Sequence, residues 1–174
     1  MLRGERVDLR PIAESDLAQL ESWRADPDYA GEYNAFGLWP AGSLRRAFAQ
    51  DGLLADDAGR LLVVDKAGKP VGDVSYRLVK HGGGLANRAY DIGLTIAPDQ
   101  RGRGYGAEAQ RLLAAYLFAT YPIARVQAGT DVTNVAEQRA LERAGFTREG
   151  VLRQAQFRLG GWHDMVVYSK LRGE

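Results

Sequence analysis

The chain has 174 residues, 45% hydrophobic and 26% charged, which is typical of a soluble globular protein long enough to form one domain over residues 1–174. Its 23 basic and 22 acidic residues give a formal net charge of +1, which argues against nucleic acid as a partner because such binders carry a basic excess. Cysteine is absent and histidine occurs only twice, which excludes disulfides, thiolate ligands and cysteine nucleophiles and leads us to expect no metal site.

The N-terminal part of the chain predicts one strand followed by two helices. Residues 7–12 alternate apolar and polar side chains, which indicates a short strand. Capping side chains at 14–16, followed by apolar residues at helical spacing, predict a helix that ends at Pro27. Residues 27–42 are rich in glycine, proline and aromatic residues and predict a long loop, after which a second short helix is expected over 43–50.

The middle of the chain predicts three strands, over residues 60–65, 72–78 and 91–96. The first is a continuous apolar run, and the second shows apolar residues on one face. Turn-forming residues at 66–70 and a run of glycines at 82–84 separate the three segments.

The C-terminal part predicts further helices and strands in alternation. Apolar residues recur on one face of a long helix over 109–117, and a strand follows at 124–128. A helix is expected over 134–144, and two β segments over 150–158 and 163–171. Strands with four interspersed helices predict an α/β fold of the mixed α+β kind, a mixed sheet with helices on both faces.

The most informative segment is Gln-Arg-Gly-Arg-Gly-Tyr-Gly at 100–106, directly after a predicted strand and before a predicted helix. A helix N-terminus has free N–H groups that attract anions, and glycines let the backbone approach a diphosphate closely. The spacing is neither a Walker loop nor a dinucleotide fingerprint. A glycine-rich turn with solvated arginines is the alternative that needs no ligand.

Arg101-x-x-Gly104-x-Gly106 resembles the acetyl-CoA pyrophosphate loop of the GCN5-related N-acetyltransferase (GNAT) superfamily. Residues 134–146, which begin with asparagine and end in Glu-Arg-Ala-Gly-Phe, resemble the helix that follows in these enzymes. The resemblance spans nearly the whole chain, with supporting segments at 4–11, 92–98 and 161–168. The most similar branch is the Rim type, the ribosomal-protein N-terminal acetyltransferases and their small-molecule relatives.

The resemblance implies a central, mostly antiparallel twisted sheet with a splayed strand pair. It also implies an N-acetyltransferase that moves acetyl from acetyl-CoA to a primary amine, on a small molecule or a protein N-terminus, by direct attack in a ternary complex. The backbone of the splayed strand would bind the pantetheine arm and place Leu94 and Ile96 against it. The amides that would hold the pyrophosphate are those of Arg101, Gly102, Arg103, Gly104, Tyr105 and Gly106.

Asn134 would contact the pantetheine or an ordered water. The sequence also allows a simpler role, because Asn134-x-x-Glu137 is close to a capping box in which both side chains satisfy helix amides. Glu137 itself departs from the family pattern, since Rim-type enzymes often carry serine there. Other GNAT enzymes place a tyrosine on this helix as general acid, and residues 134–144 contain none.

Asp91 is the candidate catalytic base by its position in the family, with a surface strand carboxylate as the alternative. His163 and Asp164 lie in the tail strand that flanks the acceptor pocket in such folds, and we expect Asp164 to hold the hairpin. Aromatic residues of the loop and the tail are candidates to line an acceptor site or to cap the core: Tyr33, Phe36, Trp39 and Trp162.

Two other functions stay open at this point, a catalytically silent acyl-CoA sensor of the same fold and a nucleotide- or phosphate-binding module. No stretch approaches the ~20 apolar residues that cross a bilayer, and the first six residues lack the apolar core of a secretion signal. We therefore expect a cytoplasmic protein, monomeric or homodimeric, with no membrane partner.

Overall fold

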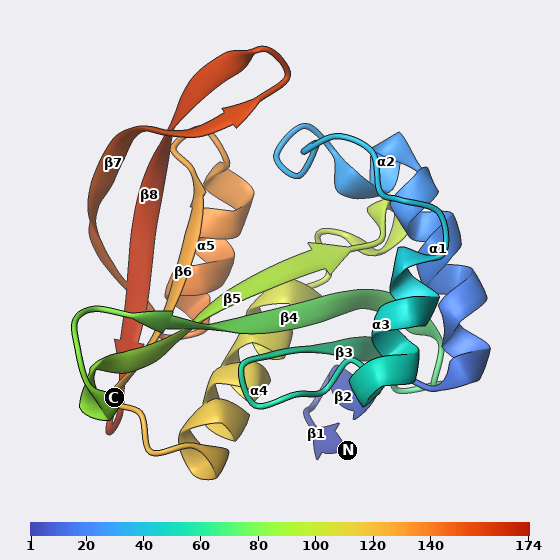
Figure 1. Cartoon of the computed structure of the whole chain (residues 1–174), viewed down its shortest axis with the longest axis horizontal. Coiled ribbons are helices and arrows are strands. Elements are labelled where there is room, and N and C mark those ends of the chain that lie inside the picture. Colours follow the sequence, from blue (N-terminus) through green and yellow to red (C-terminus); the bar gives the residue numbers. More distant parts are fainter.

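An eight-stranded mixed sheet forms the centre of the molecule in the computed structural model, which describes residues 1–174 except for the side chain of Leu85 (Figure 1). The strand order is β1-β2-β3-β4-β5-β6-β8-β7, and every neighbouring pair is antiparallel except β5 and β6. This confirms the expected fold class. The strands are β1 (Leu2–Arg3), β2 (Val7–Pro11), β3 (Ala58–Asp65), β4 (Pro70–Lys80), β5 (Arg88–Ile96), β6 (Arg125–Asp131), β7 (Thr147–Arg158) and β8 (Gly161–Leu171).

Helices cover both faces of the sheet. The α-helices are α1 (Leu17–Ala25), α2 (Pro27–Ala30), α3 (Ser43–Asp51), α4 (Tyr105–Thr120) and α5 (Val135–Arg143), and short 3-10 turns lie at η1 (Glu14–Asp16), η2 (Leu85–Asn87) and η3 (Pro98–Gln100). Leu61 and Val63 of β3 pack in the core cluster that contains α4, whereas Leu62 and Val64 pack in the cluster that contains α1 and α3. Burial on both faces explains why this strand is a continuous apolar run.

The parallel pair β5–β6 is short, and its two strands then separate. Its register covers only three residue pairs and ends where Ile92 lies opposite Ala128. Beyond that point β5 remains paired with β4 up to Ile96, and β6 remains paired with β8 up to Asp131. The edges that face each other are therefore open as a wedge, which confirms the splayed strand pair.

Two contacts fix the N-terminus of α4 beside the open end of β5. A Cβ at Gly106 would lie 2.8 Å from Cδ2 of Leu94, so glycine allows the helix to approach the strand this closely. Two residues further along α4, the buried carboxylate of Glu108 accepts hydrogen bonds from the backbone N–H groups of Glu5, Arg6 and Val7. The turn between β1 and β2 is thus tied to α4 by three charge-assisted bonds.

The structure differs from the expected elements mainly in the predicted loop 27–42. Pro27 ends α1 but also begins α2, because proline suits the first position of a helix and Asp26 accepts a hydrogen bond from the Asp28 amide at 2.9 Å. The short strand β1 was not expected. No helix that the described residues form is long and apolar enough to cross a membrane.

We expect Glu108→Ala to lower the free energy of unfolding by about 3 kcal/mol, because three backbone donors, one buried and two partly buried, lose their acceptor. Glu108→Gln keeps one acceptor oxygen and should lower it by about 1 kcal/mol. Urea unfolding at pH 7 measures the free energy of unfolding of both variants. Equal stability of the two variants and the wild type would contradict the role of Glu108 as the acceptor that ties the first turn to α4.

The same bond set predicts a pH dependence. Burial alone would raise the pKa of Glu108, but the three backbone bonds and Arg111 hold it below its ordinary value. The stabilisation is therefore complete above the pKa of an unfolded glutamate and is lost as the pH falls through the lower folded value. When the free energy of unfolding is measured as a function of pH, the values for the wild type and for Glu108→Gln should converge at low pH.

Candidate functional site

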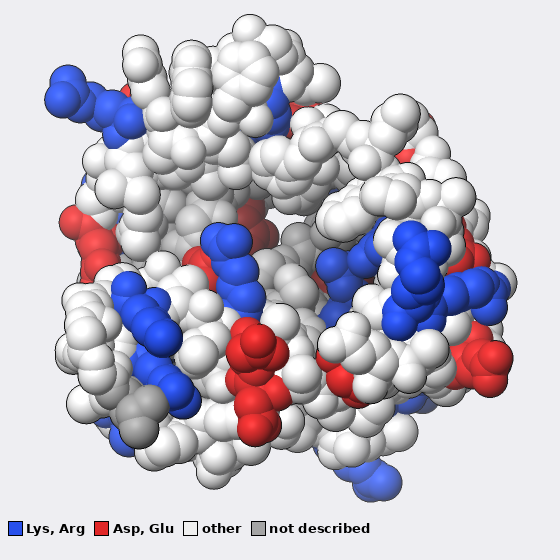
Figure 2. All heavy atoms as spheres, viewed as in Figure 1, with Lys and Arg blue, Asp and Glu red and all other residues white. Residues whose placement is uncertain are grey.

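A cavity of about 500 Å³ lies beside the edge of β5 that has separated from β6. Its walls come from residues 30–34, the end of β5 at 94–96, the segment 100–107 and one side of α5 from Asn134 to Arg143. Figure 2 shows the surface hollowed between the part that carries β7 and β8 and the part that carries α2. The cavity therefore joins segments that are far apart in the sequence.

The glycine-rich segment forms a turn at the N-terminus of α4, beside the cavity. Gly102 and Gly104 have φ angles of 76° and 80°, in the left-handed region that favours glycine. Gly104 is the N-cap of α4, and none of the described side chains caps this helix. Free N–H groups at a helix start form a site for an anion.

The arginines of this segment play unequal parts. Arg101 donates from Nε to the carbonyl of Ile96 at 3.0 Å and from Nη2 to the carbonyls of Asp28 and Tyr29. Its guanidinium thus ties the turn to β5 and α2, while its backbone N–H donates to the Pro98 carbonyl at 3.4 Å. Arg103 is exposed and gives only a long hydrogen bond, 3.5 Å, to the Asp99 carbonyl, so its charge is free to face solvent or an anion.

Leu94 and Ile96 line the cavity where β5 has left β6. Their side chains lie against α4, since both come within 4 Å of the position that a Cβ on Gly106 would take. The structure therefore brings together all nine residues expected at the cofactor except Arg103, which is not part of the wall of this cavity.

Asn134 lines the cavity and also caps α5. Its Oδ1 accepts from the Glu137 amide at 3.2 Å, and its Nδ2 donates to Oγ1 of Thr130 at 3.0 Å. The reciprocal half of a capping box is missing, because the Glu137 side chain turns to Gln110 on α4 instead. Only the asparagine half of the expected capping box is formed.

Asp91 lies away from the cavity, so the geometry gives no support to its candidate role as base. It sits on the stretch of β5 that still pairs with β6, opposite Gln127, and it does not line the cavity. Its carboxylate is held by the cross-strand partner Arg77, with Nη2 at 2.9 Å. Strand alternation places it on the face opposite Leu94. These contacts match the alternative, a surface strand carboxylate.

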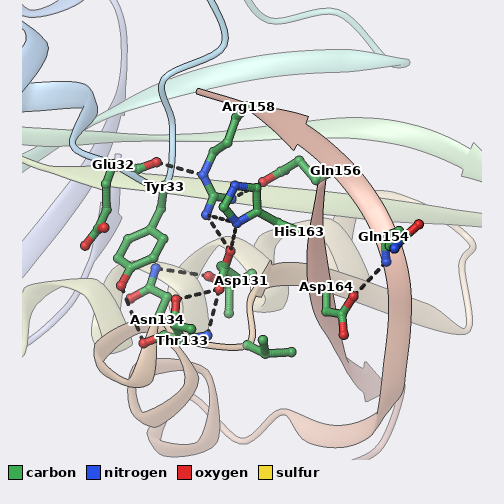
Figure 3. Close-up of polar contacts among 12 residues, drawn as sticks. Glu32, Tyr33, Asp131, Thr133, Asn134, Gln154, Gln156, Arg158, His163 and Asp164 are labelled. Carbon is green, nitrogen blue, oxygen red and sulfur yellow. Dashed lines mark hydrogen bonds and ion pairs between the residues drawn. The ribbon is translucent and has the colours of Figure 1, made fainter. Parts of the chain in front are cut away.

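A buried polar cluster lies beside the cavity, at the tip of the β7–β8 hairpin (Figure 3). Arg158 forms a salt bridge with Asp131, and both side chains are almost fully buried. Nδ1 of His163 lies 3.2 Å from the Asp131 carboxylate and 3.1 Å from Nη2 of Arg158. Arg158 also donates to the carbonyl of Glu32 at 2.7 Å and stacks over the ring of Tyr33.

This cluster connects β6, the hairpin and the loop that forms one cavity wall. Burial alone would raise the pKa of Asp131, but hydrogen bonds from Thr133 and Arg158 hold it at about 2. The sequence did not reveal Asp131 or Arg158, since an arginine beside a hairpin turn is ordinarily exposed. Asp164 holds the hairpin as expected, by accepting from the Gln154 amide at 2.7 Å.

Of the four aromatic residues proposed for an acceptor site, only Tyr33 lines the cavity. Phe36 is exposed, Trp39 lies under Arg24, and Trp162 packs against Phe157 on the hairpin. Within the described part of the chain, no group of three or more potential metal ligands is clustered.

Comparison with known proteins agrees with this geometry. A family model described as an acetyltransferase (GNAT) domain matches residues 6–147. The chain is 24% identical to p20 of Bacillus licheniformis, described as an uncharacterized N-acetyltransferase, over 99% of this chain and 97% of that protein.

Two solved structures show the same fold. A spermidine N-acetyltransferase from Vibrio cholerae, in complex with CoA and spermine, has a TM-score of 0.81 at 18% identity and covers 95% of both chains. RimL, a ribosomal-protein alpha-N-acetyltransferase in complex with coenzyme A, has a TM-score of 0.80 at 20% identity over 97% of this chain and 95% of that chain.

We expect Arg158→Met to lower the free energy of unfolding by about 3–5 kcal/mol, because it leaves the Asp131 carboxylate buried without its cation. Adding Asp131→Asn should restore part of that loss, since the uncompensated charge is then gone. Urea unfolding of the wild type, both single variants and the double variant at pH 7 measures the coupling. If the losses in free energy of unfolding of the two single variants simply add in the double variant, the coupling between Arg158 and Asp131 is contradicted.

Proposed function

The chain belongs to the GNAT acetyltransferase family and is an N-acetyltransferase, and we propose that it transfers acetyl from acetyl-CoA, bound in the β5–β6 wedge, directly to a primary amine. The observation that carries the proposal is the meeting of two sets of free backbone groups in one cavity. One set is the uncapped start of α4, and the other is the edge of β5 beyond Ile92.

Each set of backbone groups suits one part of the cofactor. The amides of residues 102–106 and the positive end of the α4 dipole suit the diphosphate. The open edge of β5 suits the pantetheine arm, whose amides can complete the strand pairing that β6 no longer provides. Leu94 and Ile96 offer apolar contact, and Asn134 offers a polar one from the opposite wall.

The acceptor amine enters, in this proposal, between the loop at 30–34 and the β7–β8 hairpin. A primary amine fits the neighbours, which include a spermidine acetyltransferase and ribosomal-protein acetyltransferases. Its lone pair attacks the thioester carbonyl once a proton has left, and a backbone N–H of the splayed strand stabilises the oxyanion. With no cysteine to carry the acetyl group, transfer is direct within a ternary complex.

His163 is placed better than Asp91 to take the proton of the amine. Neither residue lines the cavity, but His163 is half-buried, lies 3.2 Å from the Asp131 carboxylate, and is connected through Arg158 to the loop that forms the cavity wall. A silent acyl-CoA sensor is the second candidate, favoured by the distance of Asp91 from the cavity. Release of CoA in the presence of a panel of amines and peptide N-termini, with mass spectrometry of the product, separates the two functions.

We expect Gly104→Glu to weaken acetyl-CoA binding by at least ~100-fold, because it places a like charge within a few Å of the diphosphate. Calorimetry measures the affinity. Gly52→Glu is the matched control, since Gly52 also has a left-handed φ angle, 67°. It lies at the end of α3, and a Cβ added there would meet open space. Unchanged affinity in a folded Gly104→Glu variant would refute the cofactor site.

We expect the turnover rate to rise with pH on the acidic side of its profile, as the bound amine loses its proton. His163→Gln should lower turnover at pH 7 by ~10-fold or more and flatten this rise, whereas Asp91→Asn should keep the wild-type profile. Steady-state kinetics across the pH range measures both variants. The opposite pattern would return the role of base to Asp91.

A further inference from the structure

Glu137 and Gln110 form an isolated pair at the cavity wall. Glu137 lies in the first turn of α5 and lines the cavity, and Gln110 lies behind it on α4 with 1% of its surface exposed. Nε2 of Gln110 donates to Oε1 of Glu137 at 3.0 Å. Oε1 of Gln110 is buried and has no hydrogen-bond partner, the only such side-chain atom in the described part of the chain.

The unpartnered oxygen indicates which form of Glu137 fits the site. An ionised carboxylate only accepts hydrogen bonds, so it satisfies the Gln110 amide nitrogen and leaves the amide oxygen without a donor. A protonated carboxyl accepts from Nε2 with one oxygen and donates from the other to Oε1 of Gln110. The neutral acid therefore satisfies both ends of the buried amide, and the ionised acid satisfies one.

Glu137 has no ion-pair partner among the charged side chains of the cavity wall. The other charged side chains at the cavity wall are Glu32, Arg101, Arg139 and Arg143, and none of them forms an ion pair with Glu137. The acids of β6 and β7, which pack against α5, are neutralised by other arginines: Asp131 by Arg158 and Glu149 by Arg125.

The surroundings of Glu137 have the expected effect on its titration. Burial raises the pKa of the Glu137 carboxyl to about 7, and the hydrogen bond from Gln110 offsets that rise only in part. A carboxylic acid that titrates near neutral pH can both give up a proton and regain it.

We propose that Glu137 donates the proton that the CoA sulfur takes up when the thioester is cleaved, with Gln110 as the residue that positions it. The inference rests on the proposed function, since it requires acetyl-CoA in the wedge. With the diphosphate at the start of α4 and the pantetheine arm along β5, the thioester would lie in the cavity whose wall Glu137 lines from the first turn of α5.

The step balances as follows. The amine nitrogen forms a bond to the carbonyl carbon, the carbon–sulfur bond breaks, and its electron pair goes to sulfur. The carboxyl proton of Glu137 moves to that sulfur and gives the CoA thiol. The proton lost by the amine goes to the base, and water returns a proton to Glu137 before the next turnover. Glu137 thereby fills a role for which α5 offers no tyrosine.

The test compares Glu137→Gln with Glu142→Gln, a matched control on the exposed side of the same helix. Glu137→Gln should bind acetyl-CoA like the wild type by calorimetry but turn over ~100-fold more slowly. Wild-type turnover should also decline above pH 7 as Glu137 ionises, and this decline should vanish in Glu137→Gln. Glu142→Gln should match the wild type in all three measurements.

Infrared difference spectroscopy gives a second readout that does not depend on turnover. The free wild-type enzyme should show a protonated carboxyl band at pH 6 that is lost as the pH passes about 7, and Glu137→Gln should lack it. Gln110→Met should shift that transition without removing the band. Wild-type turnover in Glu137→Gln, or loss of its acetyl-CoA binding, would overturn the proposal. Failure of the wild type to bind acetyl-CoA would instead refute the proposed function and this inference with it.

Discussion

The early end of the parallel pairing between β5 and β6 is the constraint on which the site depends. Three residue pairs hold the two strands together, and after Ile92 each strand continues with its outer neighbour alone. Backbone donors and acceptors of β5 are then left on an open edge in the middle of a sheet, where a full-length partner would normally cover them. An extended ligand with its own amides is the chemical complement of such an edge.

The wedge would be of little use if the surrounding elements could move independently, and buried polar contacts prevent this on both sides. On the β5 side, Glu108 joins α4 to the first turn, and Arg101 joins the glycine-rich segment to β5 and α2. On the β6 side, Arg158 joins the hairpin to Asp131 and to the loop at Glu32. Except for the bond from Arg101 to Ile96, each contact joins segments that are distant along the chain, so the cavity keeps its shape only in the complete fold.

Local patterns were sufficient to predict every strand except β1, the long helix and the glycine-rich segment, because periodicity and turn chemistry act over a few residues. The resemblance supplied the splay, which no local pattern shows. Glu108, Asp131 and Arg158 could not be found in this way, since their roles arise from partners at least 27 residues away. Asp91 is the converse case: its place on a strand follows from the local pattern, but the register gives it Arg77 as a partner, and it does not line the cavity.

Three acidic side chains near α5 have different pKa values because their surroundings differ. Arg125, with Ser169, holds the pKa of Glu149 at about 2, and Asp131 is kept at about 2 by Thr133 and Arg158 despite its burial. Both are permanent charges that stabilise structure. Glu137 is half-buried against a neutral amide, so desolvation is unopposed by any cation and its proton is held near neutral pH. Because only the third of these acids faces the cavity, the arrangement separates carboxylates that build the site from one that can exchange a proton within it.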